Sequence, residues 1–151
     1  MESLGERGAA MKQLLLQGYK EKLFAEADIM KDQEKLKSEF AKTFLQGMVK
    51  QASLADKGIT TETLTMIRTR FILDWYANNA TKFPFRLFDF QRQLLTNGMF
   101  NAYNQWLFGP VENLAAYENW IKVNAEEYNG FVTFQKSRIF KIPPGQYYQV
   151  N

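Results

Sequence analysis

A chain of 151 residues, of which 46% are hydrophobic and 23% charged, is long enough to form one folded domain with its own core. It contains no cysteine and no histidine, which excludes disulfides, zinc sites built from Cys and His, and imidazole acid–base catalysis. The net charge of +3 is spread thinly, with 12 basic and 11 acidic residues in 1–75 and 7 basic and 5 acidic in 76–151. Proteins that bind nucleic-acid duplexes usually gather basic residues on one face. Because the basic residues of this sequence show no such concentration, we expect no specific nucleic-acid binding.

The N-terminus carries acidic residues and has no apolar run behind a basic head, so we do not expect it to be a signal peptide. A chain from which a leader had been removed would show the same pattern. The longest apolar runs, such as residues 14–16, are far too short to span a bilayer. We therefore expect no membrane insertion, and place the protein in the cytoplasm by default or within an assembled particle.

Residues 9–56 are rich in Lys, Glu, Gln, Leu and Ala, which favour helices, and apolar residues such as Phe40 and Phe44 recur at helical spacing. The interval 31–35 contains only charged and amide side chains, without glycine or proline. This pattern predicts either one very long helix or two long helices joined near that interval. With its flanking residues, 1–58 forms a predicted charged N-terminal helical arm.

A helix beginning at Thr60 is the clearest element of the sequence. Gly58 interrupts the preceding pattern, and Thr60 is a favourable N-cap for a helix that runs to about Asn78. With this cap, Ile59 and Leu64 occupy the two positions of a hydrophobic staple. The residues predicted to face the core from this helix are Ile67, Phe71 and Trp75.

Three further helices are predicted between Pro84 and the last quarter of the chain. Pro84 suits the first turn of a helix over 85–97, which ends before Gly98. A short helix over 99–108 is expected to end at Gly109–Pro110, because proline interrupts helical hydrogen bonding. Another helix then begins near residues 111–113.

The pattern after residue 130 is compatible with helix or strand, and we favour a helix to about Ser137. Two prolines and a glycine at 143–145 cannot continue a helix, so 139–151 is predicted to be an extended tail. Each of its large apolar side chains would lose about 1.5–3 kcal/mol of burial free energy if it stayed in water. We therefore expect the tail to lie over its own domain or to dock on a neighbouring subunit.

The predicted fold is thus mainly α. We expect a helical bundle with a long N-terminal helical arm (1–58), an aromatic-rich helical domain (59–138) and an extended C-terminal docking tail (139–151).

Four phenylalanines between residues 83 and 90 suggest either a stacking platform for bases or a core segment. Base stacking requires exposed rings beside a basic track, and Arg86 and Arg92 with Asp89 between them make a poor one. Core packing is therefore favoured, although some of these rings are also candidates for partner contacts. Together with the tail, the predicted partner-binding residues are Phe83, Phe85, Phe88, Ile139, Phe140, Ile142, Pro143, Pro144, Tyr147 and Tyr148.

A second aromatic cluster, residues 103–120, mixes Trp106 and Trp120 with the amides of Asn104, Gln105 and Asn119. Sugar-binding surfaces use this mixture, but amides also satisfy buried ring N–H and O–H groups. The cluster is therefore compatible with a small ligand-binding protein or enzyme around the two tryptophans.

Candidate catalytic groups are few. Glu112, Glu118, Glu126 and Glu127 offer carboxylates, but adjacent acids on one helix point to different faces, and surface positions are the simplest interpretation. The sequence contains no glycine-rich phosphate loop, nucleophile elbow or EF-hand loop. We predict that the protein is not an enzyme and has no catalytic, metal-binding or cofactor-binding residues.

These patterns favour a non-enzymatic structural or adaptor subunit that acts through protein partners or self-association in a larger assembly, such as a phage or other virion component. One alternative is a nucleic-acid accessory protein that uses lysines of the arm and exposed aromatic rings. The other is the ligand-binding protein or enzyme built around Trp106 and Trp120.

Overall fold

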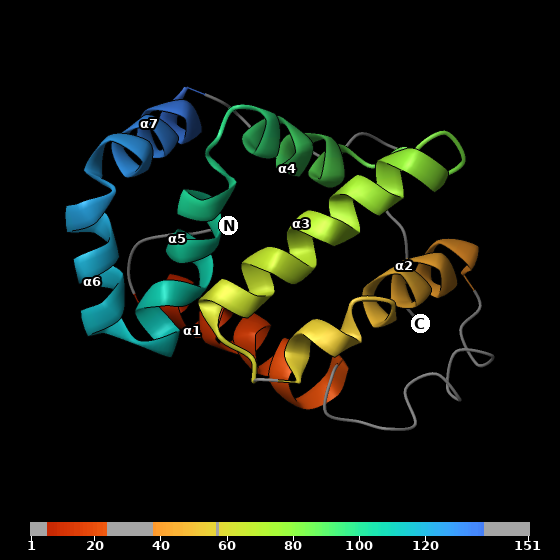
Figure 1. The fold of residues 1–151 in the computed structure, drawn as a ribbon, viewed down its shortest axis with the longest axis horizontal. Coiled ribbons are helices and arrows are strands. Elements are labelled where there is room, and N and C mark those ends of the chain that lie inside the picture. The colour runs from red at the N-terminus through yellow and green to blue at the C-terminus, as the bar shows by residue number, and fades with distance from the viewer. Residues whose placement is uncertain (1–5, 24–37, 57, 138–151) are drawn as a thin grey trace.

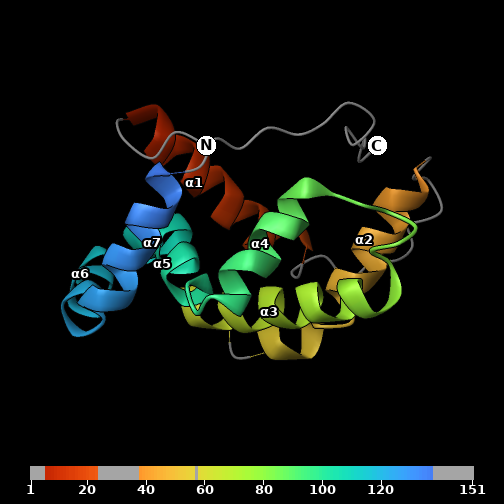
Figure 2. The same cartoon turned by 90° about the horizontal axis from the view of Figure 1, so that it is seen from above.

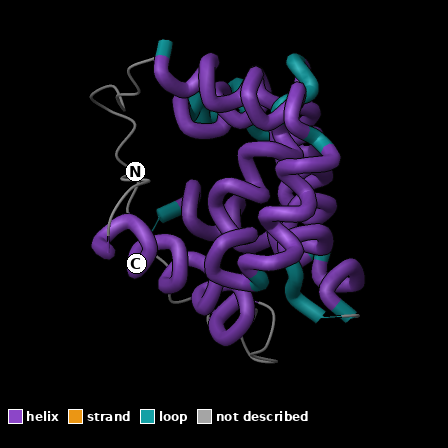
Figure 3. The backbone as a smooth tube through the Cα atoms, turned by 90° about the vertical axis from the view of Figure 1, so that its left-hand side faces the viewer, coloured by secondary structure: helices purple, strands orange, loops and turns teal. Residues whose placement is uncertain are grey.

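The computed structural model describes residues 6–23, 38–56 and 58–137. In these ranges the chain forms helices and loops and contains no strand, which confirms the predicted mainly α class for the described part (Figures 1 and 3). None of the helices in those ranges combines the length and the apolar character needed to cross a bilayer. The α-helices are α1 (Glu6–Gln17), α2 (Glu39–Val49), α3 (Thr61–Asn78), α4 (Arg86–Thr96), α5 (Phe100–Glu112), α6 (Leu114–Val123) and α7 (Ala125–Lys136).

Helices α3 and α5 hold the others together. α3 packs against α2, α4 and α5, and α5 additionally contacts α1, α6 and α7. Seen from above, α5 lies between α1 and α3 (Figure 2). A π-helical segment over Gly18–Leu23 continues α1, and a short 3₁₀ helix over Ala52–Ala55 follows α2.

The start of α3 follows from its local sequence. The Thr60 hydroxyl accepts a hydrogen bond from the Thr63 backbone N–H at 3.1 Å, and the Thr63 hydroxyl accepts one from the Thr60 N–H at 2.8 Å. This reciprocal capping satisfies two N–H groups that would otherwise lack helical partners. Leu64 is buried in a hydrophobic cluster against which Ile59 also packs. The predicted helix start is therefore confirmed.

One core cluster lies where α2, α3 and α4 meet. The ring centroids of Trp75 and Phe88 are 5.0 Å apart, and Phe40 of α2 packs edge-on against Trp75 at 5.5 Å. Gly47 allows α2 to approach closely, because a Cβ atom there would stand 3.0 Å from the Phe71 ring. The predicted core residues Ile67, Phe71 and Trp75 are all buried, so that prediction is confirmed.

The second core cluster surrounds α5. Leu16 of α1, Leu64 of α3, Leu94 of α4 and Phe131 of α7 converge on it and are all buried. Trp106 and Phe131 lie with their ring centroids 6.0 Å apart. Because five elements contribute to this cluster, α5 is the most enclosed helix of the described chain.

The predicted end of a helix at Gly109–Pro110 is wrong. α5 continues through Pro110 to Glu112. Proline has no N–H to donate to the Trp106 carbonyl one turn earlier, a loss that normally breaks a helix. Here the ammonium group of Lys12, from α1, donates to that carbonyl at 2.7 Å. The same ammonium lies 4.1 Å from the centroid of the Trp106 ring.

A second buried cation joins α3 to α5. The Arg68 guanidinium donates to the Asn104 side-chain oxygen at 2.6 Å, and the Asn104 amide nitrogen donates to the Phe100 carbonyl at 2.8 Å. The guanidinium also lies 5.2–5.8 Å from three ring centroids, a geometry in which aromatic faces attract cations. These rings belong to Phe100, Tyr103 and Phe108.

The predicted long N-terminal arm is not confirmed. Its described parts pack on the rest of the chain, with α1 against α5 and α2 against α3. Ser38 has an extended backbone and caps α2, so residues 9–56 do not form one continuous helix. The segment 24–37 between the two helices lies outside the described residues.

Replacing Trp75 with alanine is expected to lower the free energy of unfolding by about 3–5 kcal/mol, because the ring is fully buried and its loss leaves a cavity. Leu73→Ala on the same helix is the matched control, since Leu73 is 58% exposed, and is expected to cost about 0.5 kcal/mol or less. Urea unfolding curves measure the change in the free energy of unfolding for both variants. Equal losses in the two variants would contradict the assigned orientation of α3.

Candidate functional site

The structure brings the predicted aromatic residues Phe83, Phe85 and Phe88 together. Phe83 and Phe88 are buried, and half-buried Phe85 packs edge-on against Phe88 with centroids 4.9 Å apart. Phe40 of α2 contacts all three rings. The core interpretation is thus confirmed for Phe83 and Phe88, and a role of the three rings in partner binding stays a prediction.

The other predicted partner-binding residues belong to the C-terminal tail. They lie outside the described residues, and their docking role stays a prediction. These residues are Ile139, Phe140, Ile142, Pro143, Pro144, Tyr147 and Tyr148.

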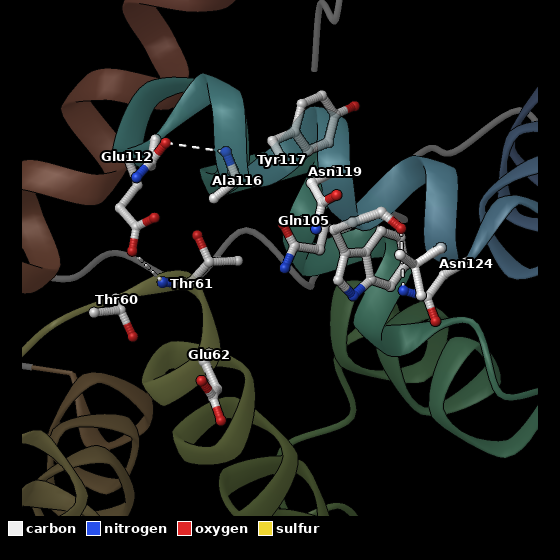
Figure 4. A pocket seen from close by; sticks show the side chains of 13 residues that line it. Thr60, Thr61, Glu62, Gln105, Glu112, Ala116, Tyr117, Asn119 and Asn124 are labelled. Atoms are coloured by element: carbon white, nitrogen blue, oxygen red, sulfur yellow. Dashed lines mark hydrogen bonds between the residues drawn. The ribbon is translucent and has the colours of Figure 1, made fainter.

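A pocket of about 490 Å³ opens where the N-terminus of α3, the C-terminal half of α5 and α6 meet (Figure 4). This volume falls within the range of small-molecule sites. The pocket coincides with part of the second aromatic cluster predicted from the sequence. Its lining residues are Thr60, Thr61, Glu62, Gln105, Gly109, Glu112, Asn113, Ala116, Tyr117, Asn119, Trp120, Val123 and Asn124.

A sharp turn between α5 and α6 creates the pocket. Asn113 has an extended backbone, and its side-chain oxygen accepts a hydrogen bond from the Ala116 N–H at 3.0 Å, which caps α6. α6 then folds back on α5, and the Tyr117 ring lies against Gly109. A Cβ atom at Gly109 would stand 2.7 Å from the Tyr117 ring, so this close approach requires glycine.

The predicted cluster is divided between the core and the pocket. Trp106 and Asn104 point into the core, where Asn104 bonds to Arg68. Gln105, Asn119 and Trp120 instead line the pocket. Of the two tryptophans, Trp120 lines the pocket and Trp106 does not, and a ligand-binding site around them stays a prediction.

Glu112 connects the last turn of α5 to the start of α3. Its carboxylate accepts a hydrogen bond from the Thr61 backbone N–H at 3.1 Å, and Figure 4 shows this contact. The N-terminus of a helix has unsatisfied N–H groups and a partial positive charge, both of which favour a carboxylate. Glu112 was expected at the surface, whereas the structure makes it a half-buried tertiary cap.

Glu127 has a similar environment at the start of α5. Burial raises the pKa of its carboxyl group, and a hydrogen bond from the Ala102 backbone N–H opposes that rise. The Oε1 atom of Glu127 is buried without a hydrogen-bond partner. Glu118 and Glu126 are exposed, as expected from the sequence.

Thr61 is a residue of the pocket that the sequence did not single out. Its side chain is only 4% exposed, and its Oγ1 atom is buried without a hydrogen-bond partner. Burying a hydroxyl without a hydrogen-bond partner costs free energy, so such a group at a pocket is a candidate for contact with a ligand. Local sequence marks Thr61 only as the residue after an N-cap and does not reveal its tertiary contact with Glu112.

The tyrosines beside the pocket are bonded to each other. The hydroxyl oxygens of Tyr117 and Tyr128 lie 2.8 Å apart. Burial and this hydrogen bond raise the pKa of Tyr117 above its ordinary value, so the phenol is neutral at physiological pH. The pair therefore fixes α6 against α7 and orients the Tyr117 ring.

A comparison of this chain with protein-family models, curated proteins and solved structures finds no match. Within the residues that the structure describes, no three acidic side chains gather as potential ligands for a metal ion.

Replacing Glu112 with alanine is expected to lower the free energy of unfolding by about 0.5–2 kcal/mol, the usual cost of a lost helix cap. Glu118→Ala removes an exposed carboxylate on the neighbouring helix and is expected to change stability by about 0.5 kcal/mol or less. Chemical denaturation of the wild type and the two variants measures the free energy of unfolding of each protein. If Glu112→Ala unfolds like Glu118→Ala, the contact with Thr61 does not stabilise α3.

Proposed function

We propose that the protein is a non-enzymatic structural subunit that works through protein–protein contacts, and that one contact joins two copies of the chain through α1. The observation that carries the proposal is the outer face of α1. Met11 is 50% exposed and Leu14 is 66% exposed, and their spacing of three residues places them on the same face of the helix. Large exposed side chains of this type gain free energy when a partner covers them.

The chemistry of this face favours a second copy as the partner. Lys12 is the one charged residue between 9 and 17, and its side chain is turned inward to the Trp106 carbonyl. The exposed residues of this stretch are therefore all uncharged, namely Ala9, Ala10, Met11, Gln13, Leu14 and Gln17. Two identical uncharged faces can meet about a two-fold axis without like-charge repulsion, and interface cores are depleted of charge.

The outer face of α3 is a useful contrast. Met66 and Leu73 are also exposed and stand two helical turns apart, but Glu62 and Arg70 are exposed on the same helix. A charged face of this kind is more easily left in water. We therefore assign the self-association surface to α1 and use α3 as the reference surface.

Analytical ultracentrifugation over a range of concentrations tests the proposal. The wild type is expected to form dimers, and Leu14→Glu is expected to be monomeric, because two buried carboxylates would meet across the two-fold axis. Leu73→Glu introduces the same charge on α3 and is expected to remain dimeric. A wild type that stays monomeric, or a Leu14→Glu variant that dimerises as the wild type does, would refute the proposal.

Ligand binding at the α3–α5–α6 pocket is a second candidate function. The unpartnered hydroxyl of Thr61 favours it, because a ligand could supply the missing hydrogen bond.

A further inference from the structure

We infer that the pocket between α3, α5 and α6 binds a neutral polyhydroxylated ligand, such as a monosaccharide or disaccharide. This inference rests on the second candidate function and is independent of self-association through α1.

The pocket offers three polar groups that remain available for a ligand. The Thr61 hydroxyl is buried without a partner, and the side-chain amides of Gln105 and Asn119 make no hydrogen bond to another described residue. Figure 4 shows these three side chains gathered in the same space. A hydroxyl and two amides can each donate and accept, which matches the hydroxyl groups of a sugar.

The other side-chain amides of the pocket make hydrogen bonds within the protein. Asn113 caps α6 through its side-chain oxygen, and the Asn124 side chain donates to the Trp120 carbonyl at 3.0 Å. Their engagement holds α6 in place and leaves ligand recognition to Thr61, Gln105 and Asn119. Polar groups that are few and fixed in direction are typical of specific small-molecule sites.

The electrostatics of the pocket favour a neutral ligand. No lysine or arginine of the described chain lines the pocket, so it lacks a cation for a phosphate or a carboxylate. The Glu112 carboxylate is bound at the N-terminus of α3, where the partial positive charge of the helix offsets its own. Figure 4 shows the Glu62 side chain turned away from the other labelled polar groups. The lining therefore disfavours an anionic ligand, and the helix terminus together with the orientation of Glu62 reduces the negative charge presented to the pocket interior.

The aromatic side chains of the pocket also suit a sugar. Trp120 and Tyr117 line the pocket and are both half-buried. The faces of aromatic rings carry partial negative charge and attract polarised C–H groups, which sugars present on their ring faces. The pocket thus combines ring faces for the C–H groups of a sugar with amides and a hydroxyl for its O–H groups.

Nuclear magnetic resonance of the ¹⁵N-labelled protein tests the inference. The chain has three tryptophans, and Trp75 and Trp106 are buried in the core, so only the indole N–H signal of Trp120 reports directly on the pocket. N-acetylglucosamine and maltose are the neutral probes, and glucuronate and choline are the anionic and cationic comparisons. We expect at least one neutral sugar to shift the Trp120 signal saturably, and to bind more tightly than either charged probe.

Thr61→Val tests the role of the hydroxyl with little change in shape. We expect it to weaken sugar binding about three- to tenfold, as for one lost hydrogen bond. Its melting temperature should equal or exceed that of the wild type, because the hydroxyl has no protein partner to lose. Thr69→Val is the matched control, since the Thr69 hydroxyl bonds to the Thr65 carbonyl within α3 and does not line the pocket.

Three outcomes would overturn the inference. These are the absence of a saturable Trp120 shift with both sugars, equal sugar affinity in wild type and Thr61→Val, and tighter binding of choline or glucuronate than of either sugar. A poorly folded Thr61→Val variant would be replaced by Gln105→Met, which removes a different donor and acceptor and is expected to weaken binding similarly. None of these outcomes bears on dimer formation, so the two proposals fail separately.

Discussion

The hydrogen bond from Lys12 to the Trp106 carbonyl is the contact on which the rest of the structure depends. Lys12 is 5% exposed, and burial lowers the pKa of its ammonium group to about 8. The desolvation that lowers the pKa is a real cost, and the carbonyl oxygen and the Trp106 ring face offset part of it. In return, α5 continues through Pro110 without leaving a buried carbonyl unsatisfied. Because α5 reaches Glu112, that carboxylate can cap α3 and define one wall of the pocket.

The same contact fixes the surface proposed for self-association. With Lys12 turned inward, residues 9–17 of α1 present Met11 and Leu14 outward, and no other residue of this stretch is charged. Arg68 follows the same physical rule on the other side of α5, where an amide oxygen and ring faces hold its charge. Both cations thus rely on neutral oxygens and aromatic faces that α5 supplies. The two proposed functions therefore depend on how α5 is anchored.

Sequence patterns predicted the elements whose signals are local. The cap at Thr60 and the staple residues Ile59 and Leu64 are neighbours in the chain, so the start of α3 could be placed. The end of α5 could not be placed, because Lys12, which lies 94 positions from Trp106, donates the hydrogen bond to the Trp106 carbonyl that proline cannot make. Composition indicated a polar and aromatic cluster near Trp120, but it could not separate side chains that enter the core from those that line the pocket. Thr61 was missed for the same reason, since its burial and its place in the pocket are tertiary features that the local sequence does not show.

A double-mutant cycle of Lys12→Met and Pro110→Ala tests most directly whether Lys12 replaces the helical hydrogen bond that Pro110 cannot make. The alanine substitution restores an N–H group that can bond to the Trp106 carbonyl, so Lys12 should matter less in that background. The predicted result is that Lys12→Met lowers the free energy of unfolding by clearly less in the Pro110→Ala variant than in the wild type, with a coupling above about 0.5 kcal/mol. Additive effects of the two substitutions would contradict the account.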